Sequence, residues 1–387
     1  MDKIRWGVRI PISPLVSDGW NKLQSEVATM RFIQRNTTIP IPEIHAYGNG
    51  ERLTDNSHTT QAFLIMDQLP GQPLQLDTLC SSATDKRNRF YADFGGILAQ
   101  LHELQFPQTG SLYPDPEDDA RSVVGPSLCL VENDLKVNTG ARRRIAPALK
   151  STTAAIRHQY DMLTDAFDVP TADASQDTAM REIFAMLSLA DLLPNFCRSP
   201  SSTGSFALCH GDLRCENILV DDDLRIQGIL DWEWATILPQ QLCTPPLWIC
   251  GHDPSMADST RNKIFEDFQR AISVDHKYSK CLRFWKEEQL CLSIAQILRH
   301  PHHLIPIYYQ HIYPRIYKEP FANAAKTFFA SEDKQRTLQD RLGASERYTN
   351  HLKQQGLFVA DEFVHELRDL LERSAKLQEA LAAKGMR

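Results

Sequence analysis

The sequence predicts an α+β fold in which a small strand-rich N-terminal portion, residues 1–69, precedes a large helical portion, residues 70–387. Near the N-terminus, short β-branched stretches alternate apolar and polar residues, which is the period of a strand. After Gly71, apolar residues recur every three or four positions, which is the period of an amphipathic helix. One pair of β-branched stretches, between residues 217 and 232, interrupts the helices.

The N-terminal portion contains three predicted strands and one helix. The strands are expected at about residues 5–12, 43–48 and 61–69, and Pro70-Gly71 ends the last of them. One apolar face at helical spacing predicts a helix between the first two strands. Its members are Trp20, Leu23, Val27, Met30 and Ile33. Two prolines in "TIPIPEIHAYG" end this helix and lead into the second strand.

The remainder is predicted to be mainly helical. One helix has an apolar face of Phe90, Phe94, Ile97, Leu101 and Leu104, and the last has one of Phe363, Leu367, Leu370, Leu377 and Leu381. The interrupting stretches, "NILVD" and "RIQGILDW", predict a two-stranded hairpin that turns around Asp221–Asp223.

Composition excludes several classes of protein. With 42 Lys and Arg against 49 Asp and Glu, the net charge is -7, so a nucleic-acid binder is not expected. No stretch approaches the roughly 18 apolar residues of a membrane span. The nine cysteines are scattered without a CxxC motif, and the first residues lack the pattern of a signal peptide. We therefore expect a soluble, cytoplasmic protein in a reducing compartment.

The segment "LCHGDLRCENILVDDDLRIQGILDWEWA" carries the candidate chemistry. Asp212 lies in a polar loop, Asn217 follows five residues later, and Asp231 follows Asp212 by nineteen. Because a hairpin brings its outer ends together, Asn217 and Asp231 are expected to face the same point. Carboxylate and amide oxygens suit Mg²⁺, which often shares its shell with phosphates. Asn217 and Asp231 are therefore candidate metal ligands, and Asp212 remains free to interact with a substrate hydroxyl.

Phosphoryl transfer fits this donor set, because it depends on positioning and on neutralising charge. Asp212 would orient the attacking hydroxyl and accept its proton. Arg214, two residues later, would supply positive charge near the transferred group. Arg9 on the first strand and Glu26 on the following helix would form an ion pair that directs a cation toward the inner phosphates.

These motifs and their order resemble the protein-kinase-like fold and, within it, the aminoglycoside phosphotransferase or phosphotransferase enzyme family, especially its fungal members. "HGD" resembles the family's catalytic loop, and "DWE" resembles its metal-binding motif. The resemblance implies that ATP and Mg²⁺ are the cofactors. It makes Asp212 the catalytic base, puts Arg214 in the place of the catalytic-loop lysine, and places Asn217 and Asp231 on the metal.

The resemblance extends to the N-terminal portion. "VRIP" is similar to the family's third strand, with Arg9 where protein kinases have lysine, and "SEVATM" is similar to the helix that carries Glu26. "FLIMDQLPGQPL" is similar to the hinge. It implies that Met66 is the gatekeeper and that backbone groups of Asp67 and Leu69 contact adenine.

The chain differs from the family at its start. Two strands and a phosphate-covering loop usually precede "VRIP", whereas this sequence begins almost at that strand. The first strand would then be a sheet edge that upstream residues or a partner must cover. The expectations are weak ATP affinity, slow turnover, and a natural protein with residues upstream of Met1.

Several residues have two interpretations. His210 is either a general base or a structural residue that binds the loop backbone, and the second is preferred because Asp212 fills the first role. "HPHH", residues 300–303, is either a metal site or a polar turn, and its spacing favours the turn. Trp232, Glu233 and Trp234 either line a substrate pocket or, for the tryptophans, pack in the core. The acidic "PDPEDD" either attracts a cationic substrate or is solvated.

The sequence therefore predicts an ATP- and Mg²⁺-dependent phosphotransferase that acts on a hydroxyl of a small molecule. A protein substrate is less expected, because nothing after Asp231 resembles the Ala-Pro-Glu segment of protein kinases. The alternative is a catalytically weak or inactive relative that binds nucleotides or a partner. The sequence indicates neither the acceptor nor the oligomeric state.

Overall fold

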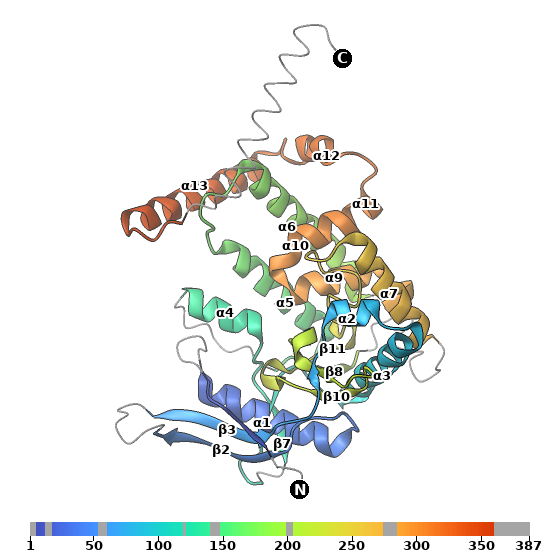
Figure 1. Ribbon diagram of the computed structural model, residues 1–387. Coiled ribbons are helices and arrows are strands. Elements are labelled where there is room, and N and C mark those ends of the chain that lie inside the picture. The colour runs from blue at the N-terminus through green and yellow to red at the C-terminus, as the bar shows by residue number, and fades with distance from the viewer. Residues whose placement is uncertain are drawn as a thin grey trace. The chain divides into compact units, whose positions relative to one another are not determined.

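The computed structural model describes residues 5–11, 18–52, 60–118, 121–139, 148–198, 204–273 and 285–359 (Figure 1). The predicted fold class is confirmed, since a small antiparallel sheet is followed by a mainly helical part. Contacts divide the chain into two compact units, residues 1–169 with 181–327, and residues 170–180 with 328–387. The predicted domain boundary at residue 69 falls within the first unit and stays a prediction.

The three predicted N-terminal strands form one antiparallel sheet in the order β1-β3-β2. They are β1 (Trp6–Arg9), β2 (Ile44–Glu51) and β3 (Gln61–Asp67). In the described sheet, β1 lies at an edge, and its Trp6 and Val8 side chains are 61% and 63% exposed. Arg9, the last residue of β1, pairs with Leu64 of β3.

Helix α1 (Gly19–Asn36) packs against this sheet (Figure 1). Asp18 caps its first turn by accepting the Asn21 N–H at 3.1 Å. Leu23 and Val27 form a small core with Leu64 of β3. The same helix buries two charged side chains, Lys22 and Glu26, which are 6% and 2% exposed. Such residues are rarely buried without partners.

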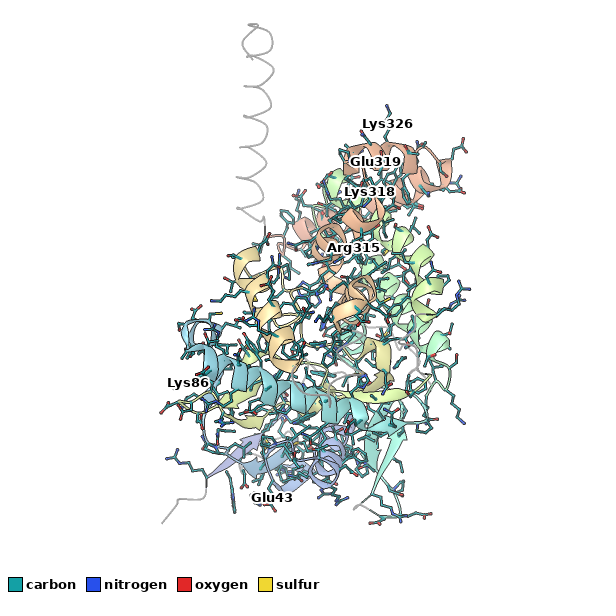
Figure 2. The ribbon with its side chains drawn as sticks, turned by 90° about the vertical axis from the view of Figure 1, so that its right-hand side faces the viewer. Glu43, Lys86, Arg315, Lys318, Glu319 and Lys326 are labelled. Carbon is teal, nitrogen blue, oxygen red and sulfur yellow. A yellow bond between two sulfur atoms is a disulfide. The ribbon has the colours of Figure 1, made fainter. Side chains whose placement is uncertain are left out.

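The predicted hairpin is formed by β9 (Ile218–Val220) and β10 (Ile226–Ile229), which pair antiparallel. Its turn is closed by Asp221, whose Oδ1 accepts the N–H groups of Asp223 and Arg225, both at 2.9 Å. A short strand, β4 (Gln72–Pro73), pairs with the other side of β9. Lys86, labelled in Figure 2, belongs to helix α3 (Thr84–Glu103), and its Nζ lies 2.7 Å from Asp223 Oδ1, so it connects this helix to the hairpin turn.

The prediction of a single hairpin within the helical part was wrong, because further strands are present. One sheet has the order β11 (Thr236–Pro239), β8 (Phe206–Cys209) and β5 (Gln105–Phe106). Another pairs β6 (Ser111–Pro114) with β7 (Ser122–Gly125). Strands of two to four residues are too short to produce a readable alternation of apolar and polar residues.

Helices make up most of the rest. They are α2 (Leu76–Ser81), α3 (Thr84–Glu103), α4 (Leu130–Thr139), α5 (Thr152–Asp168), α6 (Gln176–Cys197), α7 (Asp258–Ile272), α9 (Gln289–Arg299), α10 (Leu304–Ile307), α11 (Tyr313–Ile316), α12 (Phe321–Phe328) and α13 (Glu332–Gln354), with short turns η1 (Cys215–Asn217), η2 (Trp232–Trp234), η3 (Gln240–Leu242), η5 (Pro301–His303) and η6 (Tyr308–Ile312). Phe90 and Phe94 of α3 are fully buried and approach Trp248. The predicted helix over residues 363–381 lies outside the described residues. In the described part of the chain, no helix combines the length and apolar character needed to cross a bilayer.

The second unit is organised by α13. Its Ser345 Oγ donates to the Thr171 carbonyl at 2.6 Å and accepts the Ala174 N–H at 2.9 Å. Thr349 Oγ1 accepts the Asp173 N–H at 2.8 Å. The candidate site residues all belong to the first unit.

Candidate active site

The loop after β8 has a backbone conformation that its sequence makes possible. Gly211 has φ +89°, and a Cβ there would lie 2.2 Å from the Trp234 carbonyl oxygen, so a side chain does not fit. His210 donates from Nε2 to the Leu230 carbonyl at 2.8 Å, and its Nδ1 accepts the Asp212 N–H at 3.3 Å. Burial lowers the pKa of His210 to about 4, so the ring is neutral. These contacts agree with the structural interpretation of His210.

Asp212 projects from this loop with its side chain 20% exposed. Arg214 Nε lies 3.0 Å from its carboxylate, and the Arg214 side chain is 63% exposed. Burial raises the pKa of Asp212, and the attraction of Arg214 opposes that shift. The loop therefore presents the Asp212 carboxylate, whose proton affinity is enhanced, with the exposed guanidinium of Arg214 beside it.

Asn217 and Asp231 lie at the paired outer end of the hairpin. The Leu230 N–H donates to the Asn217 carbonyl at 2.8 Å, which places Asp231 one residue beyond that contact. Asn217 Nδ2 donates to the Asp212 carbonyl at 2.8 Å, whereas its Oδ1 makes no hydrogen bond to another described residue. Asp231 has φ 66° and ψ 58°, a left-handed conformation that is unusual for a non-glycine residue and often marks a functional site.

The predicted ion pair between Arg9 and Glu26 is present, with Nη1 2.7 Å from Oε1. The other terminal nitrogen, Nη2, lies 2.7 Å from Asp231 Oδ1 and 2.5 Å from Glu233 Oε2. Glu233 also pairs with Lys22, whose ammonium lies 4.3 Å from the centre of the Trp234 ring. The sequence analysis did not predict that Lys22 and Glu233 join this network.

Burial and charge act in opposite directions on the two central groups of the network. Burial alone would lower the pKa of Arg9, but the carboxylates of Glu26, Asp231 and Glu233 outweigh it and raise that pKa. Burial raises the pKa of Glu26 to about 7, even though Arg9 favours its ionised form. Arg9 therefore remains a cation, and Glu26 titrates near neutral pH.

The donor set fits a hard divalent cation. Asn217 Oδ1 and the Asp231 carboxylate are oxygen ligands, and Mg²⁺ held by one or two such groups completes its shell with waters and phosphates. In the ranges that the structure describes, no group of three or more His, Cys, Asp or Glu side chains is arranged to hold a metal by itself. The residues thus suit a metal that arrives with a phosphate ligand.

Comparison with known proteins settles the family. Residues 20–239, more than half of the chain, match the Phosphotransferase enzyme family, APH. The chain belongs to this family. The matched residues include the loop that carries Asp212 and the hairpin that ends at Asp231.

Several known proteins are similar to this chain. Clavilactone A biosynthesis cluster protein Y of Ampulloclitocybe clavipes is 27% identical over 62% of this chain and 57% of that protein. A subtelomeric hrmA-associated cluster protein of Aspergillus fumigatus is 24% identical over 76% and 66%. The chain therefore spans between about half and two thirds of the length of these relatives. The solved structure of a microcompartment-associated aminopropanol kinase is 13% identical over 93% of this chain and 89% of that chain, with a TM-score of 0.46.

The predicted adenine-binding residues lie at the end of β3. The Asp67 N–H donates to the Glu43 carbonyl at 2.9 Å, and Asp67 Oδ1 lies 2.6 Å from His45 Nε2. Met66 packs against the small core under α1, and Leu69 lies close to Gly228. Met66, Asp67 and Leu69 do not line the cavity beside Asp212. Their contact with adenine stays a prediction.

A cavity of about 550 Å³ opens beside Asp212. Glu233 and Trp234 line it, whereas Trp232 is 1% exposed and belongs to the core, where its Nε1 donates to the Ile229 carbonyl at 3.1 Å. The pocket interpretation of "WEW" therefore holds for Glu233 and Trp234, and the core interpretation holds for Trp232. Among the residues that the structure describes, no member of the acidic "PDPEDD" segment lines this cavity, and Asp119 lies outside the description.

The cavity wall also contains residues that the sequence analysis did not assign to the site. Arg299 and three members of the "HPHH" segment line it. The histidines are His300, His302 and His303. The polar-turn interpretation described their local structure correctly, since Pro301–His303 form the short turn η5, but it missed their place in the wall. The spacing of these histidines in the sequence does not indicate that they line the same cavity as the Asp212 loop, which lies almost ninety residues earlier.

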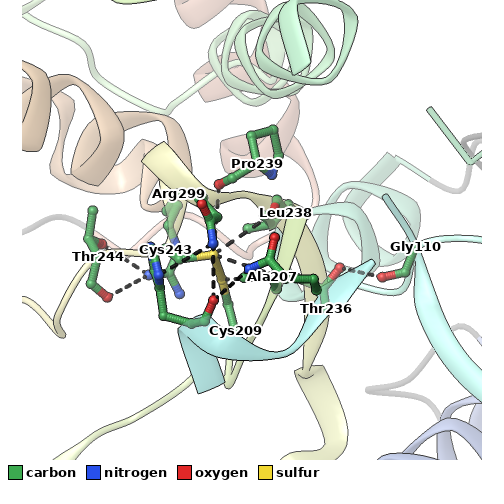
Figure 3. Close-up of a disulfide and its surroundings, with 12 residues drawn as sticks. Gly110, Ala207, Cys209, Thr236, Leu238, Pro239, Cys243, Thr244 and Arg299 are labelled. Carbon is green, nitrogen blue, oxygen red and sulfur yellow. Dashed lines mark hydrogen bonds between the residues drawn. A yellow bond between two sulfur atoms is a disulfide. The ribbon is translucent and has the colours of Figure 1, made fainter. Parts of the chain in front are cut away.

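A disulfide joins the start of the catalytic loop to the same wall (Figure 3). Cys209 and Cys243 are 34 residues apart, with their Cα atoms 5.8 Å from each other, and both line the cavity. That separation suits a disulfide. No spacing pattern among the nine cysteines predicts this pair, and it departs from the expectation of a reducing setting.

Proposed function

We propose that this phosphotransferase transfers the γ-phosphoryl group of ATP, in the presence of Mg²⁺, to a hydroxyl group of a small molecule. One observation carries the proposal: Asp212 faces a cavity of small-molecule size, while Asn217 and Asp231 lie next to its loop. The family supports a phosphotransferase. The identities of the nucleotide, the metal and the acceptor do not follow from the family and are proposed here.

The proposed reaction is a nucleophilic displacement at the γ-phosphorus of ATP by the acceptor hydroxyl. Asp212 accepts the proton of the acceptor hydroxyl, whose oxygen forms a bond to the γ-phosphorus. The bond from that phosphorus to the bridging oxygen breaks, and its electron pair leaves on ADP. Burial raises the pKa of Asp212, which makes it a better proton acceptor than an exposed carboxylate. Bound Mg²⁺ would neutralise charge on the phosphates, and Arg9 would add to that effect.

A second candidate is a nucleotide-binding protein with little transfer activity. It is favoured by the ion pair in which Arg9 holds Asp231, because the carboxylate must be shared with the metal or released to it. Under this candidate, nucleotide would bind and turnover would remain near the rate of the Asp212→Asn variant.

The experiment combines binding and transfer. Calorimetry should show that ATP binding requires Mg²⁺ and is weakened by EDTA. Transfer from γ-labelled ATP to hydroxylated small molecules should then be detected and should disappear in Asp212→Asn. Binding without any Asp212-dependent turnover would select the second candidate. The absence of Mg²⁺-dependent binding would reject both.

A further inference from the structure

Apolar and aromatic side chains form a large part of the lining of the cavity beside Asp212. Trp248 and Trp285 are 5% and 2% exposed, and both line it. Their indole N–H groups donate to the Leu213 carbonyl at 3.1 Å and the Cys243 carbonyl at 3.4 Å. The indole N–H groups thus have partners in the wall, and each ring presents a small exposed area to the cavity. Aliphatic side chains complete this surface: Leu98, Leu101, Leu130, Pro246 and Leu247.

Arg299, the last residue of α9, provides a cation in the same wall. Its Nη1 donates to the carbonyl and the hydroxyl of Thr244 at 3.3 and 3.1 Å (Figure 3). Burial lowers the pKa of Arg299 to about 10, so the guanidinium is still charged at neutral pH. Among the described residues, no carboxylate lies within ion-pair distance of it. A half-buried guanidinium with unused donors is stabilised by an anion.

The carboxylates of the cavity are already engaged. Asp212 is paired with Arg214, and both Asp231 and Glu233 are paired with Arg9. Asp253, the remaining carboxylate among the described lining residues, accepts hydrogen bonds from the backbone and hydroxyl of Ser255 at 2.9 and 2.6 Å. Each of these four carboxylates therefore already has a hydrogen-bonding or ionic partner within the chain.

The histidines do not change this balance. Burial lowers the pKa of His300, His302 and His303 below the ordinary value, so the three rings are uncharged near pH 7. They offer neutral donors and acceptors around the cationic Arg299. An aminated sugar would have to compete with these internal partners for the lining carboxylates and would also meet the cationic Arg299.

We propose that the acceptor is a hydroxylated carboxylic acid with an apolar, ring-bearing body. Its carboxylate would pair with Arg299, its ring would lie against Trp248 and Trp285, and its hydroxyl would point to Asp212. This inference rests on the proposed phosphoryl transfer and names its substrate class. The transfer step is the one written above, with the acceptor oxygen as nucleophile.

Three probes test the proposal on the wild-type chain in the presence of Mg²⁺ and ADP. 6-Hydroxy-2-naphthoate has a hydroxyl and a carboxylate on one ring system, 2-naphthol lacks the carboxylate, and kanamycin is a polycation. Tryptophan fluorescence quenching measures the first two, and calorimetry measures the third. We expect the naphthoate to bind roughly tenfold or more tightly than the naphthol, which corresponds to one charge-assisted hydrogen-bonded pair. Kanamycin should bind more weakly than either.

Variants of Arg299 locate the effect. Arg299→Met should make the two naphthalene ligands bind equally, Arg299→Lys should retain part of the preference, and Arg225→Met, an exposed arginine paired with Asp93, should retain all of it. If Arg299→Met does not fold, the lysine variant and the wild-type ranking still decide. Equal binding of the naphthalenes by the wild type, preference for kanamycin, or no binding of any probe would each overturn the proposal.

ATP binding measured on the same protein samples distinguishes failure of the assigned substrate class from failure of the proposed phosphoryl transfer. Mg²⁺-dependent ATP binding involves no acceptor, so its loss would reject phosphoryl transfer itself. Intact ATP binding together with a preference for kanamycin would reject only the assigned substrate class.

Discussion

Arg9 and Asp231 form an ion pair in which Nη2 of the guanidinium lies 2.7 Å from Oδ1 of the carboxylate. The two residues are 222 positions apart, so the first strand is tied directly to the end of the hairpin. Asp231 is also the proposed metal ligand. Metal binding and the position of β1 are therefore coupled through one carboxylate.

Replacing Asp231 with asparagine should weaken Mg²⁺-dependent binding of ATP, because the metal loses its charged ligand in the proposed site. We expect a loss of at least roughly tenfold in affinity, the lower end of what metal sites show when a supporting group is removed. Calorimetry with and without EDTA measures it. The exposed Glu216→Gln serves as the control, and an unchanged Mg²⁺-ATP affinity in Asp231→Asn would rule out the ligand role.

Replacing Asp212 with asparagine should reduce transfer by roughly 10²–10⁴-fold, the contribution of a well-placed general base. Folding and ATP binding should persist, because Asp212 is not one of the two proposed metal ligands. Among the described residues, its side chain forms a hydrogen bond only with Arg214. Steady-state turnover and calorimetry provide the two readings. Asp93→Asn, at an exposed site, should match the wild type. Near wild-type turnover in Asp212→Asn would contradict the assignment of the base.

Adding a methyl group at Gly211 should displace the catalytic loop. The residue has φ +89°, and the new Cβ would overlap the Trp234 carbonyl. We expect Gly211→Ala to lose roughly 1–3 kcal/mol of stability from the strained backbone, and to lose turnover as well. Gly7→Ala is the matched control, since nothing lies within 4 Å of its added Cβ. Thermal unfolding and turnover measure both effects, and equal behaviour of the two variants would argue against the tight loop.

The carboxyl group of Glu26 should make stability depend on pH. Burial raises its pKa to about 7 from an ordinary value of 4.5, so between these pH values the folded protein keeps a proton that the unfolded chain loses. Raising the pH through this window therefore lowers the free energy of unfolding, in this case by about 3 kcal/mol. Glu26→Gln does not titrate, so the difference between wild type and variant isolates the effect.

Urea unfolding at several pH values between 4.5 and 7 measures that difference. The exposed Glu103→Gln should leave the wild-type slope unchanged. A difference between wild type and Glu26→Gln that stays constant across the window would show that the Glu26 carboxyl is not protonated in the folded protein.

Much of the fold could be predicted from local patterns. The three N-terminal strands and the hairpin were predicted because each has β-branched alternation bounded by turn residues. Arg9 and Glu26 were predicted as partners from their places on the first strand and the following helix, and the family resemblance implied the same pair. Strand β5 was not predicted, because two residues carry no period, and β11 pairs with β8, which is not its neighbour in the sequence.

The remainder of the site depends on contacts between segments far apart in sequence. Glu233 reaches Arg9 from the turn after Asp231, and Arg299 reaches the cavity from the end of α9. Neither residue has a local signature, since a charged side chain near a turn or at a helix end is ordinary. The pairing of Cys209 with Cys243 likewise joins positions 34 residues apart, and no local pattern marks either cysteine.

The same disulfide closes a covalent ring of chain, and that ring contains every residue of the hairpin and the catalytic loop. Asp212, Asn217 and Asp231 are members of one macrocycle. A protease that cuts the exposed turn at Asp222 would break the backbone there and still leave the two flanking pieces attached to each other. Nicked protein would migrate as one chain without reductant and as two with it, and Asp212 and Asn217 would then be on one fragment and Asp231 on the other.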